Sequence, residues 1–177
     1  MNKAKECFLS AKKAEEKRKK HKGLLVVGQD NKLAERYIAK AKTNLSTCAL
    51  FRKNRLDYKI PEEWFYTMYY CALAILAKFG IESRSQKCTA LFLKFAKEND
   101  LIDYEGEFID RIMVYSDKEE KTDVDQREEA RYGASVHSEG IMEKYGFMMD
   151  VCKRCISQAE EIVYSNRKLK IPKELLE

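Results

Sequence analysis

The chain has 177 residues and a net charge of +5, and 45% of its residues are hydrophobic. A chain of this length forms about one domain and can bury a core without disulfides or a structural metal. Only seven glycines and two prolines are present, and valine and threonine are scarce, which excludes most sandwiches, barrels and collagen-like folds. The hydrophobic content excludes a disordered chain. The composition therefore predicts an all-α protein.

The positive charge is concentrated at the N-terminus. Residues 1–22 hold nine Lys or Arg and three Glu, whereas residues 101–129 hold eleven acidic and four basic residues. A basic helix is predicted over residues 3–20. Its apolar line, at Ala4, Phe8, Ala11 and Glu15, is too narrow for a core helix. This segment is suited either to contact nucleic acid or to pair with an acidic surface of the same fold or of a partner.

Four further helical segments are predicted after the basic one. The spacing of Ala34, Ile38 and Ala41 predicts a helix over about 31–53, capped by Asp30 or Asn31. Pro61 begins a helix that is apolar nearly all round and ends at Gly80, so it is the predicted centre of the fold. A fourth helix is capped by Ser83 or Ser85. It is followed by a short helix containing Phe108, Ile109, Ile112 and Met113.

A last helix is predicted to extend to about residue 167, with a break near 133–138, because apolar residues keep a heptad rhythm from Ile141 to Ile162. The whole is predicted to be an up-and-down antiparallel bundle of four to five helices with an extra basic N-terminal helix. The expected organisation is a basic helix and linker (1–29), a helical bundle (30–167) and a short tail (168–177).

The N-terminus and the cysteines predict a location. The first residues lack the apolar core of a signal peptide, and the most apolar run, residues 64–77, is shorter than a membrane-spanning helix, so no membrane contact is expected. Six cysteines without a secretion signal predict reduced thiols and a cytoplasmic protein. Cys152 and Cys155 form a CxxC pair, for which core packing and zinc or redox chemistry are the alternatives.

Four segments of the chain resemble the HEPN family. Residues 64–80, Trp-Phe-Tyr-Thr-Met-Tyr-Tyr-Cys-Ala-Leu-Ala-Ile-Leu-Ala-Lys-Phe-Gly, are similar to its Tyr-Tyr-Ala-Met-type segment, Ala-Leu-Leu-Ala run and following Gly. Residues 83–89 resemble its Ser-x-Asn-His-x-x-Thr helix start, with Ser85 in place of Asn and Gln86 in place of His. Residues 33–41 and 127–132 are similar to its opening helix and its Arg-x-x-Ala-x-Tyr segment. The resemblance covers about residues 30–166.

The resemblance implies a small helical homodimer, often encoded with a minimal nucleotidyltransferase partner. In many members it implies a toxin-type ribonuclease that needs no metal or organic cofactor. Those members use an Arg followed, after four to six residues, by a His, and both subunits contribute to one cleft. Arg131 and His137 match this spacing. Some members carry a Tyr two residues after the His that is modified with AMP; Glu139 stands there, so this control is not expected.

These residue types suit RNA cleavage by the 2′-hydroxyl group. A His with a pKa near 6.5 can accept or donate the proton, and an Arg fork matches phosphate oxygens. His137 is the candidate general base or acid, Arg131 the phosphate ligand, and Arg127 a second cation one turn earlier. Six positions correspond to about 240° around an unbroken helix, so Arg131 and His137 converge only at a bend near Gly133 or across a dimer. The alternatives are a solvated helix end for both and an ion pair for Arg127.

Three hypotheses for the function follow. The first is a dimeric, metal-independent endoribonuclease that acts on RNA. The second is a non-catalytic bundle that binds a nucleotide or a minimal nucleotidyltransferase. The third is a scaffold whose basic helix docks on an acidic partner. An aromatic row, formed by Trp64, Phe65, Tyr66, Tyr69 and Tyr70, is expected to pack in the core rather than to stack on bases.

Overall fold

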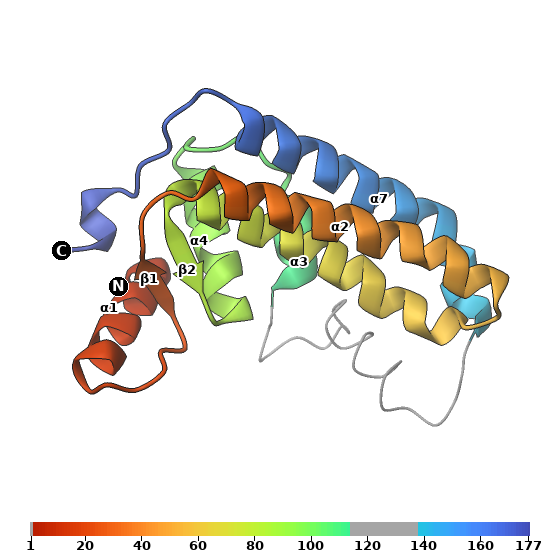
Figure 1. Ribbon diagram of the computed structural model, residues 1–177, viewed down its shortest axis with the longest axis horizontal. Coiled ribbons are helices and arrows are strands. Elements are labelled where there is room, and N and C mark those ends of the chain that lie inside the picture. Colours follow the sequence, from red (N-terminus) through yellow and green to blue (C-terminus); the bar gives the residue numbers. More distant parts are fainter. Residues whose placement is uncertain (1, 114–137) are drawn as a thin grey trace.

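The computed structural model describes residues 2–113 and 138–177 (Figure 1). This part of the chain forms six α-helices and one two-stranded antiparallel sheet. The elements are α1 (Lys3–Glu16), β1 (Leu24–Val26), α2 (Asn31–Lys53), α3 (Ile60–Phe79), β2 (Ile81–Ser83), α4 (Gln86–Glu98), α5 (Gly106–Ile112) and α7 (Ser138–Tyr164), with short 3₁₀ turns η1 at Asp57–Lys59 and η2 at Lys173–Leu175. The prediction of a mostly helical fold is confirmed.

Helix α3 lies at the centre of the molecule, as its apolar sequence predicts. Its buried side chains point in several directions, and Ile75, Leu76 and Ala72 are completely inaccessible to solvent. Helices α2 and α7 run alongside it, and α2 runs opposite to both α3 and α7 (Figure 1). Burial of a helix on all sides is the expected result of apolar residues around its whole circumference.

Three predicted helix ends are confirmed by their caps: the starts of α2 and α4 and the end of α3. Asp30 accepts a hydrogen bond from the backbone N–H of Leu33 at 2.8 Å, and Ser85 accepts one from that of Cys88 at 3.2 Å. These bonds satisfy N–H groups that have no partner within the helix. Gly80 follows α3 with a φ of +81°, the left-handed conformation that Gly adopts without strain.

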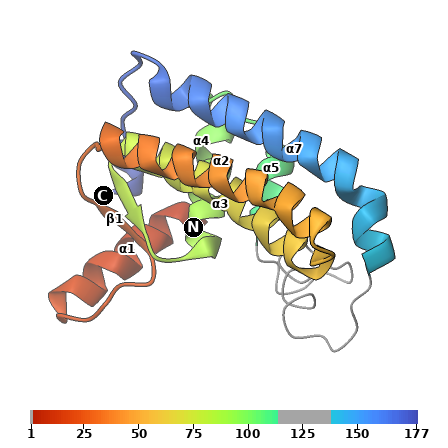
Figure 2. The same ribbon diagram turned by 45° about the vertical axis from the view of Figure 1, so that its right-hand side comes forward.

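The small sheet is absent from the sequence-based prediction. Strand β1 pairs antiparallel with β2, with Leu25 opposite Glu82 and Val26 opposite Ile81. Each strand has three residues, which is too short to show the alternation of side chains that identifies a strand. Figure 2 shows that β1 lies between α1 and the end of the bundle, so the sheet joins the basic helix to the bundle.

Helix α1 packs against the same core as the bundle. Ala4, Cys7, Phe8 and Ala11 are buried, whereas Glu15, which was expected on the inner stripe, is exposed. The helix ends at Glu16 rather than near residue 20. The ring of Phe92 on α4 makes edge contacts with Phe8 at 6.1 Å and with Phe79 at 5.0 Å.

The expectation that all six cysteines are reduced is wrong in this structure. Cys7 on α1 and Cys88 on α4 form a disulfide, with their Cα atoms 5.8 Å apart. The sequence separation of 81 residues gives no sign of this proximity, which arises only when α1 packs on α4. Cys152 and Cys155 are completely buried on α7, which favours the core-packing alternative for this pair.

Thiol titration is expected to count four free cysteines in the unfolded chain. The four free cysteines are all buried, and burial raises the pKa of the Cys48 thiol to about 12. A hydrogen bond with Cys155, followed by burial, raises the pKa of Cys71. The folded protein, prepared without reductant, should therefore show almost no reaction with an aromatic disulfide reagent, because the thiolate is the reacting species.

Denaturant alone should release four reactive thiols, and denaturant after reduction should release six. Six thiols in denaturant without prior reduction would show instead that Cys7 and Cys88 are not joined. The folded protein in the same reagent is the control, because it separates burial from the absence of thiols.

Within the described ranges, no helix has both the length and the hydrophobicity required to cross a membrane. After α7 the chain turns back, and Leu169 and Leu175 of the C-terminal segment are buried. The 3₁₀ turn η2 contacts α1, so both ends of the chain lie at the same end of the molecule (Figure 1).

Candidate nucleotide-binding cavity

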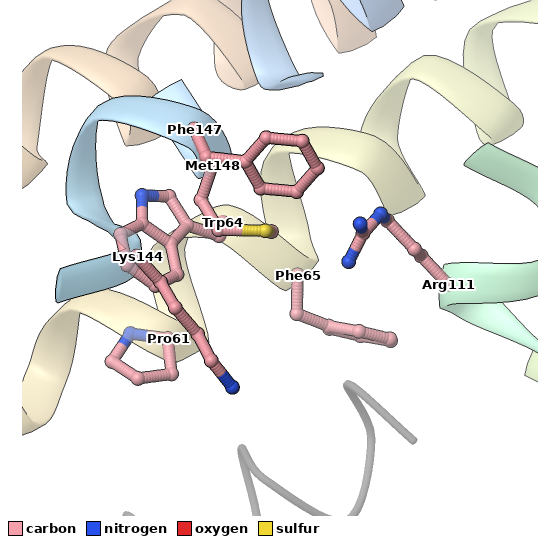
Figure 3. A pocket seen from close by; sticks show the side chains of 7 residues that line it. All are labelled: Pro61, Trp64, Phe65, Arg111, Lys144, Phe147 and Met148. Carbon is pink, nitrogen blue, oxygen red and sulfur yellow. The ribbon is translucent and has the colours of Figure 1, made fainter. Parts of the chain in front are cut away.

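A cavity of about 200 Å³ opens where α3, α5 and α7 meet (Figure 3). Its lining combines an apolar floor with two cationic side chains. The lining residues are Pro61, Trp64, Phe65, Arg111, Lys144, Phe147 and Met148. An apolar pocket with a few polar groups is the usual form of a small-molecule site.

The floor of the cavity belongs to the core. Trp64 is 5% exposed, and Phe65 and Met148 are buried as well. The Trp64 ring lies 6.1 Å from that of Tyr145 on α7, so the first turns of α3 are packed firmly against α7. These contacts confirm the predicted core packing for Trp64 and Phe65, and they give the cavity a rigid base.

Phe147 is the exposed aromatic side of the cavity. It is 57% exposed, whereas the adjacent Met148 is buried. The guanidinium of Arg111 lies 5.5 Å from the centre of its ring. Figure 3 shows this ring and the Arg111 side chain facing one another across the opening. An exposed ring beside a cation is suited to stacking on a nucleobase.

Arg111 is held in place by a chain of ion pairs. Its Nη2 atom lies 2.8 Å from Oε1 of Glu107, one turn earlier on α5. Glu107 also contacts Arg154 of α7 at 3.1 Å, and Arg154 pairs with Glu105. Hydrogen bonds from Arg111 and then from Arg154 hold the pKa of Glu107 below its usual value. The ion pair therefore contributes to stability at pH values above the ordinary pKa of a glutamate carboxyl. This contribution is lost as the pH falls through the lowered pKa of Glu107, where the carboxylate becomes protonated.

Lys144 supplies the second cation. It lies on α7 three residues before Phe147, so both side chains fall on one face of the helix. Its side chain is exposed and forms no ion pair with the residues that the structure describes. Lys144 and Arg111 approach the cavity from opposite sides (Figure 3), an arrangement that suits an anionic group such as a phosphate.

The residues predicted to be catalytic, Arg127, Arg131 and His137, lie outside the described residues. His137 directly precedes Ser138, the first residue of α7, in the sequence. Arg111, Lys144 and Phe147 were not predicted as site residues. Only the spacing of Lys144 and Phe147 on α7 could have indicated a shared face; the approach of Arg111 depends on tertiary packing.

The tyrosines of the aromatic row are only half-buried, unlike Trp64 and Phe65. Tyr70 stacks on Tyr66 at 5.8 Å and on Tyr37 of α2 at 6.1 Å. The ammonium group of Lys40 lies 4.7 Å from the centre of the Tyr70 ring. These rings pack on one another across α2 and α3 and lie against the core, as predicted for the aromatic row, although their edges remain accessible.

Comparison of the chain with protein-family models, with curated proteins and with solved structures finds no match in any of the three.

Proposed function

We propose that the chain is a HEPN-type endoribonuclease that cleaves RNA by attack of the 2′-hydroxyl group, without a metal, as a homodimer of toxin type. The observation that carries this proposal is the cavity, in which the cations of Arg111 and Lys144 meet the exposed ring of Phe147. A nucleotide of RNA presents a phosphate and a base, which match the cations and the ring. The cavity lies beside α7, whose first residue follows His137 in the sequence.

The proposed step uses groups of the chain and of the substrate alone. His137 accepts the proton of the 2′-hydroxyl as O2′ attacks phosphorus. The bond from phosphorus to O5′ breaks, the protonated His137 gives the proton to O5′, and a cyclic 2′,3′-phosphate remains. Arg131, with Arg127 as a second cation, stabilises the charge that develops on the phosphate oxygens. The resemblance to the HEPN family supports these assignments.

The second candidate is a non-catalytic module that binds a nucleotide. One observation favours it: the described residues that line the cavity include no histidine and no carboxylate. The cavity by itself is therefore equipped for binding and not for proton transfer. A minimal nucleotidyltransferase is the proposed partner in this case, and the cytoplasm is the proposed location for both functions.

Trp64 makes the cavity directly observable, because it is the single tryptophan of the chain and lies in the cavity floor. Titration with a short single-stranded RNA of mixed sequence, in EDTA, is expected to change the Trp64 fluorescence and to yield cleaved products. The 2′-deoxy version of the same oligonucleotide should change the fluorescence without being cleaved, since it lacks the attacking hydroxyl.

Lys144→Ala is expected to weaken binding of the deoxy oligonucleotide by about fivefold to tenfold, the effect of one charge-assisted contact. Lys153→Ala is the matched control, because Lys153 is on the same helix and its ion pair among the described residues is with Asp150, at 3.6 Å. A fluorescence change without cleavage would overturn the nuclease in favour of the binding module. No fluorescence change with either oligonucleotide would overturn both.

A further inference from the structure

The turn that follows α1 carries an unusual density of charge. We call residues 17–22, Lys-Arg-Lys-Lys-His-Lys, the basic turn; five of its six side chains are cationic and exposed. In the described part of the chain, none of these five forms an ion pair. Elsewhere exposed cations do find partners: Lys42 lies 2.6 Å from Glu160, and Arg84 lies 2.6 Å from Glu82. Lys144 is also unpaired among the described residues, so what distinguishes the basic turn is that five such cations lie within six consecutive residues.

The basic turn is also held in a defined shape. Backbone N–H groups of Arg18 and Lys19 donate to Glu15 and Ala14 at 2.7 and 2.9 Å, and Arg18 has a left-handed φ of +52°. His21 is 4% exposed, and its Nε2 lies 3.2 Å from the Glu82 carboxylate on β2. An ordered turn keeps five like charges close together, which costs free energy unless a counter-charge is bound.

Both ends of the turn are fixed to the bundle. Before it, α1 is joined to α4 by the Cys7–Cys88 disulfide. After it, the backbone at Gly23 passes so close to α1 that a Cβ there would lie 2.3 Å from the carbonyl oxygen of Cys7. The basic turn is thus a rigid feature of the surface. It lies at the end of the molecule away from the first turns of α3 and α7, where the cavity is (Figure 1).

We propose that the basic turn is a docking surface for the phosphate backbone of single-stranded RNA, separate from the cavity. Lysine is depleted in protein–protein interfaces, and the exposed residues of the turn include no apolar side chain to form a dry centre. A polyanion, in contrast, gains affinity from each cation that replaces a counterion. This inference rests on the proposed function, because RNA held here would extend along the bundle toward the cavity.

The experiment measures affinity of the full chain for a long, single-stranded, 2′-deoxy oligonucleotide over a series of salt concentrations. The test variant carries Lys17→Gln, Lys19→Gln and Lys20→Gln. The control variant carries Lys32→Gln, Lys53→Gln and Lys153→Gln, three exposed lysines on α2 and α7 that give the same change of net charge. In the test variant, the slope of log Kd against log salt concentration should fall by about 0.7 for each phosphate contact that is lost. Binding at 0.1 M salt should weaken roughly 30- to 100-fold.

A single substitution provides a second test that does not disturb the fold. Arg18→Gly should retain the turn, because glycine prefers the left-handed conformation that Arg18 adopts. Arg55→Gly is its match: Arg55 has a φ of +55°, follows α2 in the same way and is also exposed. Arg18→Gly should weaken binding about fivefold, and Arg55→Gly should leave it unchanged.

The outcomes separate this inference from the proposed function. A mononucleotide reaches only the cavity, so its effect on Trp64 fluorescence should be the same in the basic-turn variants and in the wild type. Equal loss of oligonucleotide affinity in the test and control variants would overturn the inference. The inference would also be overturned if the test variant lost binding to vesicles of anionic lipid but bound the oligonucleotide as the wild type does. That result would identify the basic turn as a membrane-binding surface. Failure of the cavity variant Lys144→Ala to weaken binding would affect the proposed function alone.

Discussion

Replacing His137 with alanine is expected to lower the rate of RNA cleavage in EDTA by about 100-fold to 10,000-fold, the usual contribution of a general acid or base. The imidazole is the proposed acceptor of the 2′-hydroxyl proton, and alanine has no group that can replace it. Binding should change little, since the described cations at the cavity are on Arg111 and Lys144. Single-turnover cleavage at saturating protein, with the unfolding midpoint measured in parallel, separates loss of chemistry from loss of fold.

The other histidine of the chain is the matched control. His21 is buried, and its ring lies between the backbone N–H of Gly23 and the carboxylate of Glu82. His21→Gln should therefore lower stability while leaving the cleavage rate of the folded protein unchanged. In the wild type, the rate should depend on pH near the ordinary pKa of histidine, about 6.5, and this dependence should vanish in His137→Ala. A variant without His137 that cleaves RNA at the wild-type rate would remove the assigned site.

Arg131 and His137 also differ in what their loss should do to the reaction. Arg131→Ala removes charge stabilisation but leaves the base, so the remaining activity should keep its pH dependence. The same loss of pH dependence in both variants would contradict the division of roles. Mixing the two inactive variants should restore part of the activity if the dimer contributes one residue from each subunit.

The sequence predicted those parts of the fold that depend on local chemistry. Asp30 and Gly80 mark the start of α2 and the end of α3 because caps act through neighbouring backbone groups. The pairing of Leu25 with Glu82 could not be predicted, because the two residues are 57 positions apart and each strand is very short. The Cys7–Cys88 disulfide was missed for the same reason.

The candidate cavity was not predictable, although its residues are ordinary members of predicted helices. Trp64 and Met148 have the spacing of core residues, and they are core residues. The cavity exists because α5 ends beside α7 and brings Arg111 to the ring of Phe147. Periodicity within each helix predicts which face is buried, but it contains no information about which side chains of different helices meet at the rim.

The second large effect is expected at Gly80, the residue that joins α3 to β2. Its carbonyl oxygen accepts a hydrogen bond from the N–H of Val27 at 2.9 Å. A Cβ on Gly80 would lie 2.7 Å from the carbonyl carbon of Gly28 and 2.8 Å from the nitrogen of Gln29. These atoms are backbone, so they cannot rotate away as a flexible side chain would. Gly80→Ala must therefore displace the segment that leads into α2.

Gly80→Ala should lower the free energy of unfolding by about 2–4 kcal/mol, from the strain of the left-handed conformation together with overpacking. Gly28→Ala separates these two effects. Gly28 has a φ of +94°, and a Cβ there would meet no atom within 4 Å, so only conformational strain of about 1 kcal/mol is expected. Urea unfolding of both variants measures the difference, with unchanged slopes showing that the change is in stability. Equal losses in the two variants would mean that the close approach of Gly80 to Gly28 is absent, and with it the junction that positions α2 against α3.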